Sequence, residues 1–330
     1  PETMLGDTAI AVNPKDDRYK SLVNKFVIIP LVERKIKIIE DDYADPEQGT
    51  GAVKITPAHD FNDYEVGQRN NLEILNIFTS DGKINENASK EFVGLDRFEA
   101  RKKILKKLKE GDFLVKEENI KNKIPYGDRS NSIIEPYLTE QWFADAKKLS
   151  VKAKDVVNTK KINFFPKNWS KTYFQWIDNI EPWCISRQLW WGHQIPAWYG
   201  PDKKIFVANN EDEANAAAKK HYNKDVNLIR DPDVLDTWFS SGLWPFATLG
   251  WPDHKEYVEK FYPTTVLVTG FDIIFFWVAR MIMFGTEFLH KEPFKDIYVH
   301  ALVRDEKGQK MSKSKGNVID PLDLIEKYSA

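Results

Sequence analysis

The 330-residue sequence is poor in cysteine and has no long hydrophobic run that is free of charge. Its single cysteine, Cys184, excludes a disulfide framework and any zinc site with several cysteine ligands, and it is typical of a reducing compartment. The longest apolar stretch, residues 264–284, is interrupted by Asp272 and Arg280, so we expect a buried strand and a core helix there. The first residues also lack the pattern of a secretory signal peptide. These absences predict a soluble, cytoplasmic protein with no membrane partner.

The sequence also has no excess of charge of either sign, with 48 basic and 50 acidic residues. A nucleic-acid partner would therefore have to be bound through local basic faces and shape. The length allows two domains with separate cores. Because the first residue is not methionine and the last expected helix is only two turns long at residue 330, we expect an internal piece of a longer polypeptide.

A lysine-rich loop near the C-terminus is the most informative stretch. The apolar run 297–303 predicts a buried strand, and residues 305–308 predict a turn. Asp320 and Pro321 predict the start of a helix over 322–328. Lysine ammonium groups on a loop between strand and helix suit a polyanion whose charge moves during reaction, such as the phosphates of ATP. The alternative is a solvated basic loop.

The string Lys310-Met311-Ser312-Lys313-Ser314 in this loop is similar to the signature loop of the class I aminoacyl-tRNA synthetases. The resemblance implies ATP, carried with Mg²⁺, as a substrate. It implies that Lys310 and Lys313 are catalytic, because they stabilise charge on the departing pyrophosphate. Met311, Ser312 and Ser314 would complete the ATP-binding loop.

A second constellation follows a predicted buried strand at 266–268. Gly270 allows a close backbone turn, and Asp272 is expected to cap the next helix, at the place where an α/β fold binds its ligand. The segment 270–277 resembles the valyl-tRNA synthetases rather than their isoleucyl and leucyl relatives. That resemblance implies adenosine contacts from Gly270 and Asp272, and a nucleotide contact from His300, which could instead cap the sheet end. It implies a valine pocket walled by residues that would otherwise be ordinary core, namely Trp238, Ile273 and Trp277.

The N-terminal third predicts a β-barrel-like domain from short strands at 9–12, 26–31, 35–39 and 52–55. Asp60 stands at a helix N-cap, and Asp63 stands where a capping-box acid would be. With Lys54 and Thr56 on the preceding strand, the same two carboxylates could instead form a polar pocket that binds an ammonium group and orients a water. A metal cluster around His59 and Asp60 is a further alternative.

Segments 1–9, 49–60 and 63–65 resemble the editing domain of the valyl-tRNA synthetases. The resemblance implies that Asp60 and Asp63 hold the amino group and hydroxyl of misattached threonine, with Lys54, Thr56 and Thr3 lining the pocket. Threonine is nearly isosteric with valine, so a valine pocket rejects it only weakly, for which this enzyme family is the standard example. A second site that rewards the hydroxyl can remove the error. The family's Thr-Thr-Arg ahead of Pro1 is missing.

Between these regions we expect helices at 97–109 and 147–161, an aromatic core over 169–199 and a polar peripheral insertion at 200–232. By resemblance Arg187 steadies the acceptor end of tRNA, although an ion pair would explain it equally well. Some relatives carry zinc-binding cysteines in this part of the chain, and here no zinc or other metal is expected.

The sequence thus predicts an α/β fold in which 1–140 form an editing domain. Residues 141–330 are expected to form the C-terminal half of a Rossmann-like catalytic domain that carries the loop 310–314. The expected function is part of a valyl-tRNA synthetase, a monomer with valine, ATP, tRNA(Val) and threonyl-tRNA as partners. Without the family's His-x-Gly-His motif, the piece should not aminoacylate alone. Alternatives are a passive tRNA-binding fragment, an isoleucyl- or leucyl-type synthetase and, ranked third, a metal-dependent phosphohydrolase.

Overall fold

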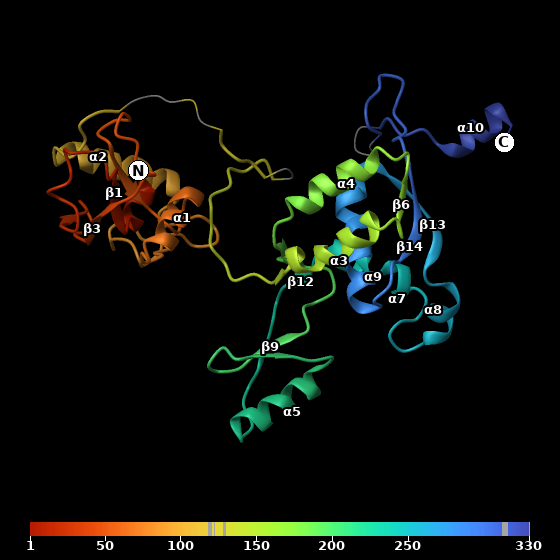
Figure 1. Cartoon of the computed structure of the whole chain (residues 1–330). Coiled ribbons are helices and arrows are strands. Elements are labelled where there is room, and N and C mark those ends of the chain that lie inside the picture. Colours follow the sequence, from red (N-terminus) through yellow and green to blue (C-terminus); the bar gives the residue numbers. More distant parts are fainter. Residues whose placement is uncertain (118–120, 122, 128–129, 312–315, 330) are drawn as a thin grey trace. The chain divides into compact units, whose positions relative to one another are not determined.

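A computed structural model describes residues 1–117, 121, 123–127, 130–311 and 316–329, which divide into two compact units, 1–140 and 141–330 (Figure 1). Both units are mixed α/β structures with open sheets. Within the described residues, none of the helices combines the length and the apolar character that crossing a membrane requires.

The first unit is built on a four-stranded sheet in the order β2-β3-β1-β4, in which β1 pairs parallel with β3 and the other neighbours are antiparallel. Strands β2 and β4 are the edges of the described sheet, so it is open, and barrel-like closure stays a prediction. In chain order the elements are η1 (Glu2–Gly6), β1 (Ala9–Val12), β2 (Phe26–Ile28), β3 (Lys35–Glu40), β4 (Ala52–Ile55), α1 (Phe61–Arg69) and α2 (Arg97–Glu110).

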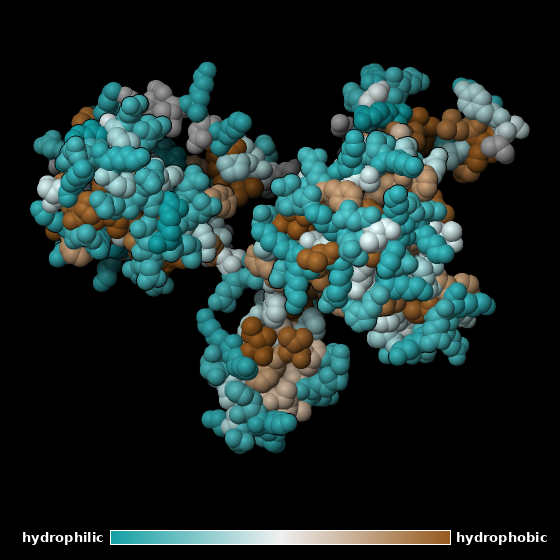
Figure 2. All heavy atoms as spheres, viewed as in Figure 1, coloured by the Kyte–Doolittle hydropathy of each residue, from teal (hydrophilic) through white to brown (hydrophobic). Residues whose placement is uncertain are grey.

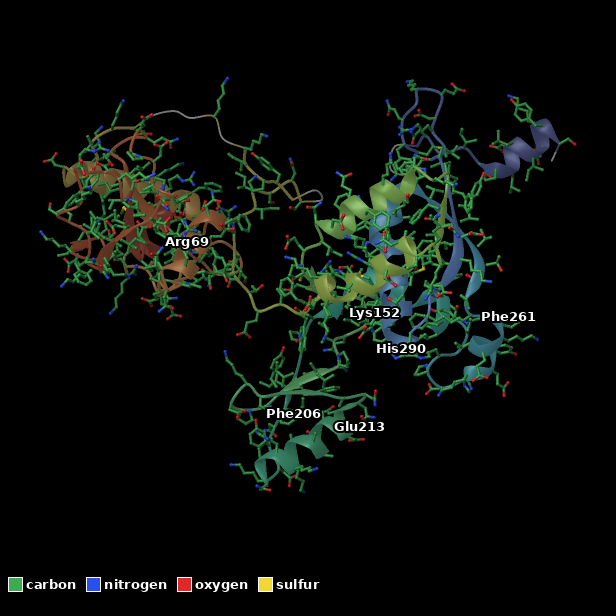
Figure 3. The ribbon with its side chains drawn as sticks, viewed as in Figure 1. Arg69, Lys152, Phe206, Glu213, Phe261 and His290 are labelled. Atoms are coloured by element: carbon green, nitrogen blue, oxygen red, sulfur yellow. The ribbon has the colours of Figure 1, made fainter. Side chains whose placement is uncertain are left out.

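The four strands lie where the sequence predicts them, although two end at other residues: β3 ends one residue later, at Glu40, and β2 ends earlier. The second strand ends at Ile28 instead of reaching Leu31, because the backbone turns through left-handed conformations at Leu31 (φ 71°) and Glu33 (φ 51°). Helix α1 is tied to β3 by Arg69, labelled in Figure 3, which donates two hydrogen bonds to Asp41 at 2.8 and 2.7 Å. This clamp fixes the helix that carries Asp60 and Asp63 at its start.

The second unit centres on a three-stranded parallel sheet in the order β13-β14-β6, packed with helices around one hydrophobic core. Its elements before the insertion are β5 (Phe143–Ala144), α3 (Ala146–Asn158), β6 (Asn163–Phe165), α4 (Trp169–Asp178), β7 (Trp183–Cys184) and β8 (Ser186–Arg187). Those after it are β12 (Val234–Leu235), α6 (Thr237–Gly242), α7 (Trp244–Ala247), α8 (Lys255–Phe261), β13 (Thr264–Gly270), η2 (Phe271–Ile273), the π-helix η3 (Ile274–Ala279), α9 (Arg280–Phe288), β14 (Phe294–His300) and α10 (Pro321–Tyr328).

The insertion has a small core of its own. Strands β9 (Ala197–Tyr199), β10 (Ile205–Val207) and β11 (Ile229–Arg230) form a separate sheet, on which α5 (Glu211–Tyr222) packs through Phe206, Ala214 and Ala218 (Figure 3). Apolar side chains also remain exposed on these strands, and Figure 2 shows hydrophobic side chains gathered on this part of the unit. The expected insertion is therefore an ordered subdomain.

Three expectations around the parallel sheet are wrong. The strand predicted over 297–303 runs from Phe294 to His300, because the chain leaves the sheet after its pairing partner Gly270 ends β13. The strand at 266–268 is only half buried, because β13 is an edge strand of the described sheet and exposes Val266 and Val268 while burying Leu267. Asp272 caps no helix, because it lies inside the 3-10 turn η2, whose N-cap position is Gly270.

Candidate functional site

The carboxyl ends of two parallel strands bring three predicted ATP-binding residues together. Gly270 and His300 are register partners at the last positions of β13 and β14. A Cβ placed on Gly270 would lie 2.8 Å from Asp272 Oδ1 and 3.8 Å from His300 Cε1, so the three residues surround one space that only a glycine leaves open. His300 Nδ1 lies 2.8 Å from the carbonyl oxygen of Ala301, and its ring is exposed. This edge is where an α/β sheet binds its ligand.

Lys310 reaches the same edge from the loop. Its Nζ donates to Asp272 Oδ2 at 3.3 Å, although the two residues are 38 positions apart in sequence. The lysine sits on a hairpin that is closed by a bridge between Arg304 and Lys310 and turns at Gly308, where φ is +73°. An ion pair this exposed contributes little stability, so the ammonium group can exchange the carboxylate for a phosphate. Met311 follows half buried, and the predicted Ser312, Lys313 and Ser314 lie outside the described residues.

The three predicted valine-pocket residues lie on α6 and on the segment from η2 to η3. Trp238 stacks on Phe276 at a centroid distance of 5.9 Å, and Trp277 Nε1 donates to the carbonyl oxygen of Ser241 at 3.0 Å. Ile273 ends η2, directly before the π-helix, a conformation often found at functional sites. Both tryptophans are partly buried against the main core. These three residues could therefore form the wall of a valine pocket or serve as ordinary core residues, and the arrangement is compatible with both.

Asp236 is a buried anchor that the sequence did not single out. Its Oδ2 accepts from Trp183 Nε1 at 2.9 Å and pairs with Arg187 at 3.1 Å and Arg280 at 3.3 Å. Its Oδ1 accepts from the backbone N–H of Trp238 and caps α6. Burial lowers the pKa of Arg280 to about 10, against the attraction of Asp236. For Arg187 the alternative to a tRNA contact was an ion pair, and Arg187 does make an ion pair with Asp236. Its contact with tRNA stays a prediction.

In the first unit, Lys54, Thr56 and Asp63 come together as predicted, and Asp7 joins them. Lys54 Nζ donates to Thr56 Oγ1 at 2.6 Å and lies 3.5 Å from Asp63 Oδ2. The Thr56 hydroxyl donates to Asp7 Oδ1 at 2.5 Å, and Lys54 Nζ is 3.9 Å from the same oxygen. Only the lysine side chain is substantially exposed, so the cluster presents one ammonium group to solvent above two buried carboxyl groups.

Burial shapes the charge of this cluster. It raises the pKa of Asp7 to about 7, while Lys54 and the Thr56 hydroxyl oppose the shift. Burial also raises the pKa of Asp63, against the backbone N–H of Thr56 and the charge of Lys54. Such perturbed carboxyl groups beside a lysine are typical of sites that handle protons or ammonium groups.

Two expectations about the helix start are resolved. Asp60 is the N-cap of α1, because its Oδ1 accepts from the backbone N–H groups of Asn62 and Asp63 at 2.9 and 3.0 Å. The capping-box role of Asp63 is wrong, because its Oδ2 accepts from the backbone N–H of Thr56 at 2.8 Å instead. Thr3 lies in η1, and within the described residues its hydroxyl makes no hydrogen bond to the cluster. The place of Asp60 and Thr3 in an editing pocket therefore depends on contacts that they would make to a ligand.

His59 has no free nitrogen to offer a metal. Its Nε2 accepts from the backbone N–H of Ile77 at 3.0 Å, and its Nδ1 faces the carbonyl oxygen of Pro136 at 3.4 Å. Its ring packs on Phe78, and burial lowers its pKa. Across the described ranges, no three His, Cys, Asp or Glu residues gather in a way that could hold a metal ion. The geometry thus favours a packing role for this histidine.

Comparison with known proteins agrees with the lysine-loop resemblance. The chain is 85% identical over 330 residues to the Valine–tRNA ligase of Pelagibacter ubique and 60% identical over 326 residues to that of Caulobacter vibrioides, covering 100% and 99% of this chain. It spans only 38% and 36% of the lengths of these relatives. The solved LeuRS–tRNA–LeuAMS complex of Agrobacterium radiobacter matches 99% of this chain and 40% of its own, at 19% identity and a TM-score of 0.38. The family model described as tRNA synthetases class I (I, L, M and V) matches residues 7–330, and the chain therefore belongs to that family.

Proposed function

We propose that this chain is part of a valyl-tRNA synthetase. Residues 1–140 would be its editing domain, with the barrel-like architecture of the family, and 141–330 would be the C-terminal half of its Rossmann-like catalytic domain, with the insertion at 200–232. The observation that carries the proposal is the 85% identity to a Valine–tRNA ligase over all 330 residues. The proposed partners are valine, ATP with its Mg²⁺, tRNA(Val) and threonyl-tRNA, in a cytoplasmic monomer.

In the proposed synthetic reaction, the valine carboxylate attacks the α-phosphate of ATP and pyrophosphate leaves, and the valyl group then passes from AMP to the terminal ribose of the tRNA. Gly270, Asp272 and His300 would hold the nucleotide at the strand ends. Lys310, with Lys313 from the same loop, would stabilise the negative charge that builds on the pyrophosphate. The Lys310–Asp272 contact supports this role, because the lysine Nζ lies 3.3 Å from the Oδ2 of a carboxylate that would itself contact the nucleotide.

The side chains of Trp238, Ile273 and Trp277 would form the valine pocket. Two indoles and one branched aliphatic chain offer apolar surface, and the only hydrogen bond from Trp277 Nε1 in the described residues goes to the Ser241 carbonyl oxygen. Such a pocket rewards size and branching but cannot strongly reject an isostere with a hydroxyl. A valine enzyme with this wall therefore needs a second site.

That second site would be the cluster of Lys54, Thr56 and Asp63, with Asp60 at the N-cap of α1 and Thr3 of η1 lining the same pocket. Asp60 and Asp63 would bind the ammonium group and the hydroxyl of the threonyl ester, and a water held in the cluster would attack the ester carbonyl carbon, so that threonine leaves from the ribose oxygen. The mixture of hydroxyl, ammonium and carboxyl groups supports this role, because a valyl ester would leave those groups without hydrogen-bond partners.

The synthetic half of the proposal is tested by joining the chain to the flanking sequence of its Pelagibacter ubique relative, which yields a full-length chimera that we call the completed protein. Valine-dependent ATP–pyrophosphate exchange should appear in the completed protein and not in the 330-residue chain alone, which has no His-x-Gly-His motif. Exchange driven by isoleucine or leucine in preference to valine would assign the chain to one of those relatives instead.

The editing half is tested by deacylation of threonyl-tRNA(Val). We expect the completed protein to hydrolyse it and to spare valyl-tRNA(Val), and we expect Asp63→Asn to lose this activity while keeping exchange. A chain that binds the tRNA without hydrolysing threonyl-tRNA in either form would be a passive binding module.

A further inference from the structure

Two residues close the base of the hairpin that carries Lys310. Asn317 Nδ2 donates to Asp305 Oδ2 at 2.7 Å and to the backbone carbonyl oxygen of Lys310 at 3.4 Å. The other oxygen of Asp305 accepts from the backbone N–H groups of Lys307 at 3.0 Å and Gln309 at 2.7 Å. One carboxylate thus holds the turn on one side and the returning chain on the other.

We propose that Asp305 and Asn317 are positioning residues that hold Lys310 beside Asp272 at the nucleotide end of the parallel sheet. This inference rests on the proposed function and adds residues to it, since neither side chain would touch ATP. Asn317 acts through the backbone of Lys310, and Asp305 acts through Asn317 and the turn.

The need for such support follows from the lysine itself. Its side chain is 69% exposed and has four rotatable bonds, and its ion pair with Asp272 is too open to water to fix it. The position of its ammonium group therefore depends on the position of its backbone. That backbone is held by the bridge to Arg304 on one side and by the Asn317 amide on the other.

Ordinary turn formation explains only part of this network. An aspartate that accepts from backbone N–H groups two and four residues later is common turn chemistry. The bond from Asn317 spans 12 residues and is not needed for the turn. It joins the two ends of the loop segment that contains Lys310, so its removal should leave the turn intact and release the lysine backbone.

The consequence for reaction is specific. A group that stabilises charge on a departing pyrophosphate acts in the transition state, so a displaced lysine lowers kcat. The proposed valine pocket lies on α6 and the η2–η3 segment, so the KM for valine should not change. A general loss of structure would change both quantities and the melting temperature.

The experiment compares variants of the completed protein in valine-dependent ATP–pyrophosphate exchange. Asn317→Ala should lower kcat about 10-fold, as expected for a hydrogen bond to a charged group, with the valine KM and the threonyl-tRNA deacylation rate unchanged. Asn317→Asp should lower kcat at least as much, because it places two carboxylates against each other. The exchanged pair Asp305→Asn with Asn317→Asp restores the net charge and the bond between positions 305 and 317, but a carboxylate at 317 cannot donate to the Lys310 carbonyl oxygen. We therefore expect it to recover part of the kcat that Asn317→Asp loses and to stay below the unsubstituted protein.

Gln309→Ala is the matched control, because it removes an exposed amide side chain from the same turn and should leave kcat unchanged. An Asn317→Ala protein with unchanged kcat would overturn the inference, and so would an exchanged pair no better than Asn317→Asp. A completed protein that shows no exchange before any substitution would refute the proposed function itself, and the positioning role with it.

Discussion

The hydroxyl of Thr56 donates a 2.5 Å hydrogen bond to Asp7 Oδ1, and these two residues lie 49 positions apart. The contact exists because β1 and β4 pair antiparallel, which brings Asp7, two residues before β1, beside Thr56, the residue after β4. It places a carboxyl group in a buried position, where the half-exposed Lys54 is the cation that most opposes the rise in its pKa. The ionisation of Asp7 is therefore coupled to the stability of the first unit.

The first prediction concerns this coupling. Because the pKa of Asp7 is about 7 in the folded chain and near 3.8 when unfolded, the folded state binds more protons between these values, and stability falls as pH rises from about 4 to about 7. Asp7→Asn cannot titrate and should remove up to about 1.4 kcal/mol per pH unit of this slope. All 11 tryptophans lie beyond residue 140, so unit 1 is best followed by pulsed hydrogen exchange of β1 and β4 against urea.

The control for this measurement is Asp17→Asn, which removes an exposed carboxyl group paired with Lys20 and should leave the slope unchanged. An Asp7→Asn protein whose stability varies with pH as steeply as the unsubstituted chain would show that Asp7 ionises normally.

The second prediction concerns Lys54, whose ammonium group lies near both carboxyl groups of the cluster. Lys54→Met should abolish most of the threonyl-tRNA deacylation of the completed protein. It should also destabilise the first unit by roughly 1 kcal/mol at pH 8 and by less at pH 5, because the carboxyl groups are charged at the higher pH and the lysine is partly screened by solvent. Lys37→Met, at an exposed position of β3, is the control and should do neither. Equal losses at both pH values would contradict the electrostatic explanation.

Contacts between residues that are close in sequence could be predicted, whereas contacts between residues far apart in sequence could not. Lys54 lies on β4 and Thr56 directly follows the strand, two residues later, so both side chains point to the same side. Asp60 precedes a helix, so its capping role was predictable. Asp320 caps α10 for the same local reason. Asp7 was missed because its place depends on the pairing register of β1 with β4, which no short pattern encodes.

In the second unit, too, residues picked out by a motif were predicted and residues placed by distant contacts were missed. Gly270 and His300 were picked out by motif, and their juxtaposition follows from parallel pairing at one sheet edge. Asp236 was missed because its three side-chain partners come from three other elements, namely Trp183 from β7, Arg187 from β8 and Arg280 from α9. Asp272 was misassigned because a helix N-cap and a carboxylate that pairs with a distant lysine at a strand end have the same local sequence pattern, and the 3-10 turn η2 and the position of Lys310 appear only in the fold.

The third prediction tests the space at the strand ends. Gly270 has a φ of −77°, which alanine adopts without strain, so Gly270→Ala should leave the urea midpoint of tryptophan fluorescence nearly unchanged. Its added Cβ would lie 2.8 Å from Asp272 Oδ1, so the carboxylate must shift, and the new methyl group would take up part of the space proposed for the nucleotide. The KM for ATP in pyrophosphate exchange should rise about 10-fold or more, corresponding to one lost hydrogen bond to a charged group. An unchanged KM would place the nucleotide elsewhere.

The last prediction concerns the buried charge at Asp236. Replacing it with asparagine leaves Arg187 and the buried Arg280 facing each other without a counter-charge, and this should cost about 3 kcal/mol of unfolding free energy. Tryptophan fluorescence should report the loss directly, because Trp183 donates to Asp236 and lies 3.7 Å under the Arg280 guanidinium. Asp178→Asn removes a carboxylate from an exposed pair with Lys154 and should cost less than about 1 kcal/mol. If the two substitutions shift the urea midpoint equally, the three charges are solvated well enough to need no partner, and Asp236 does not anchor the helix that carries Trp238.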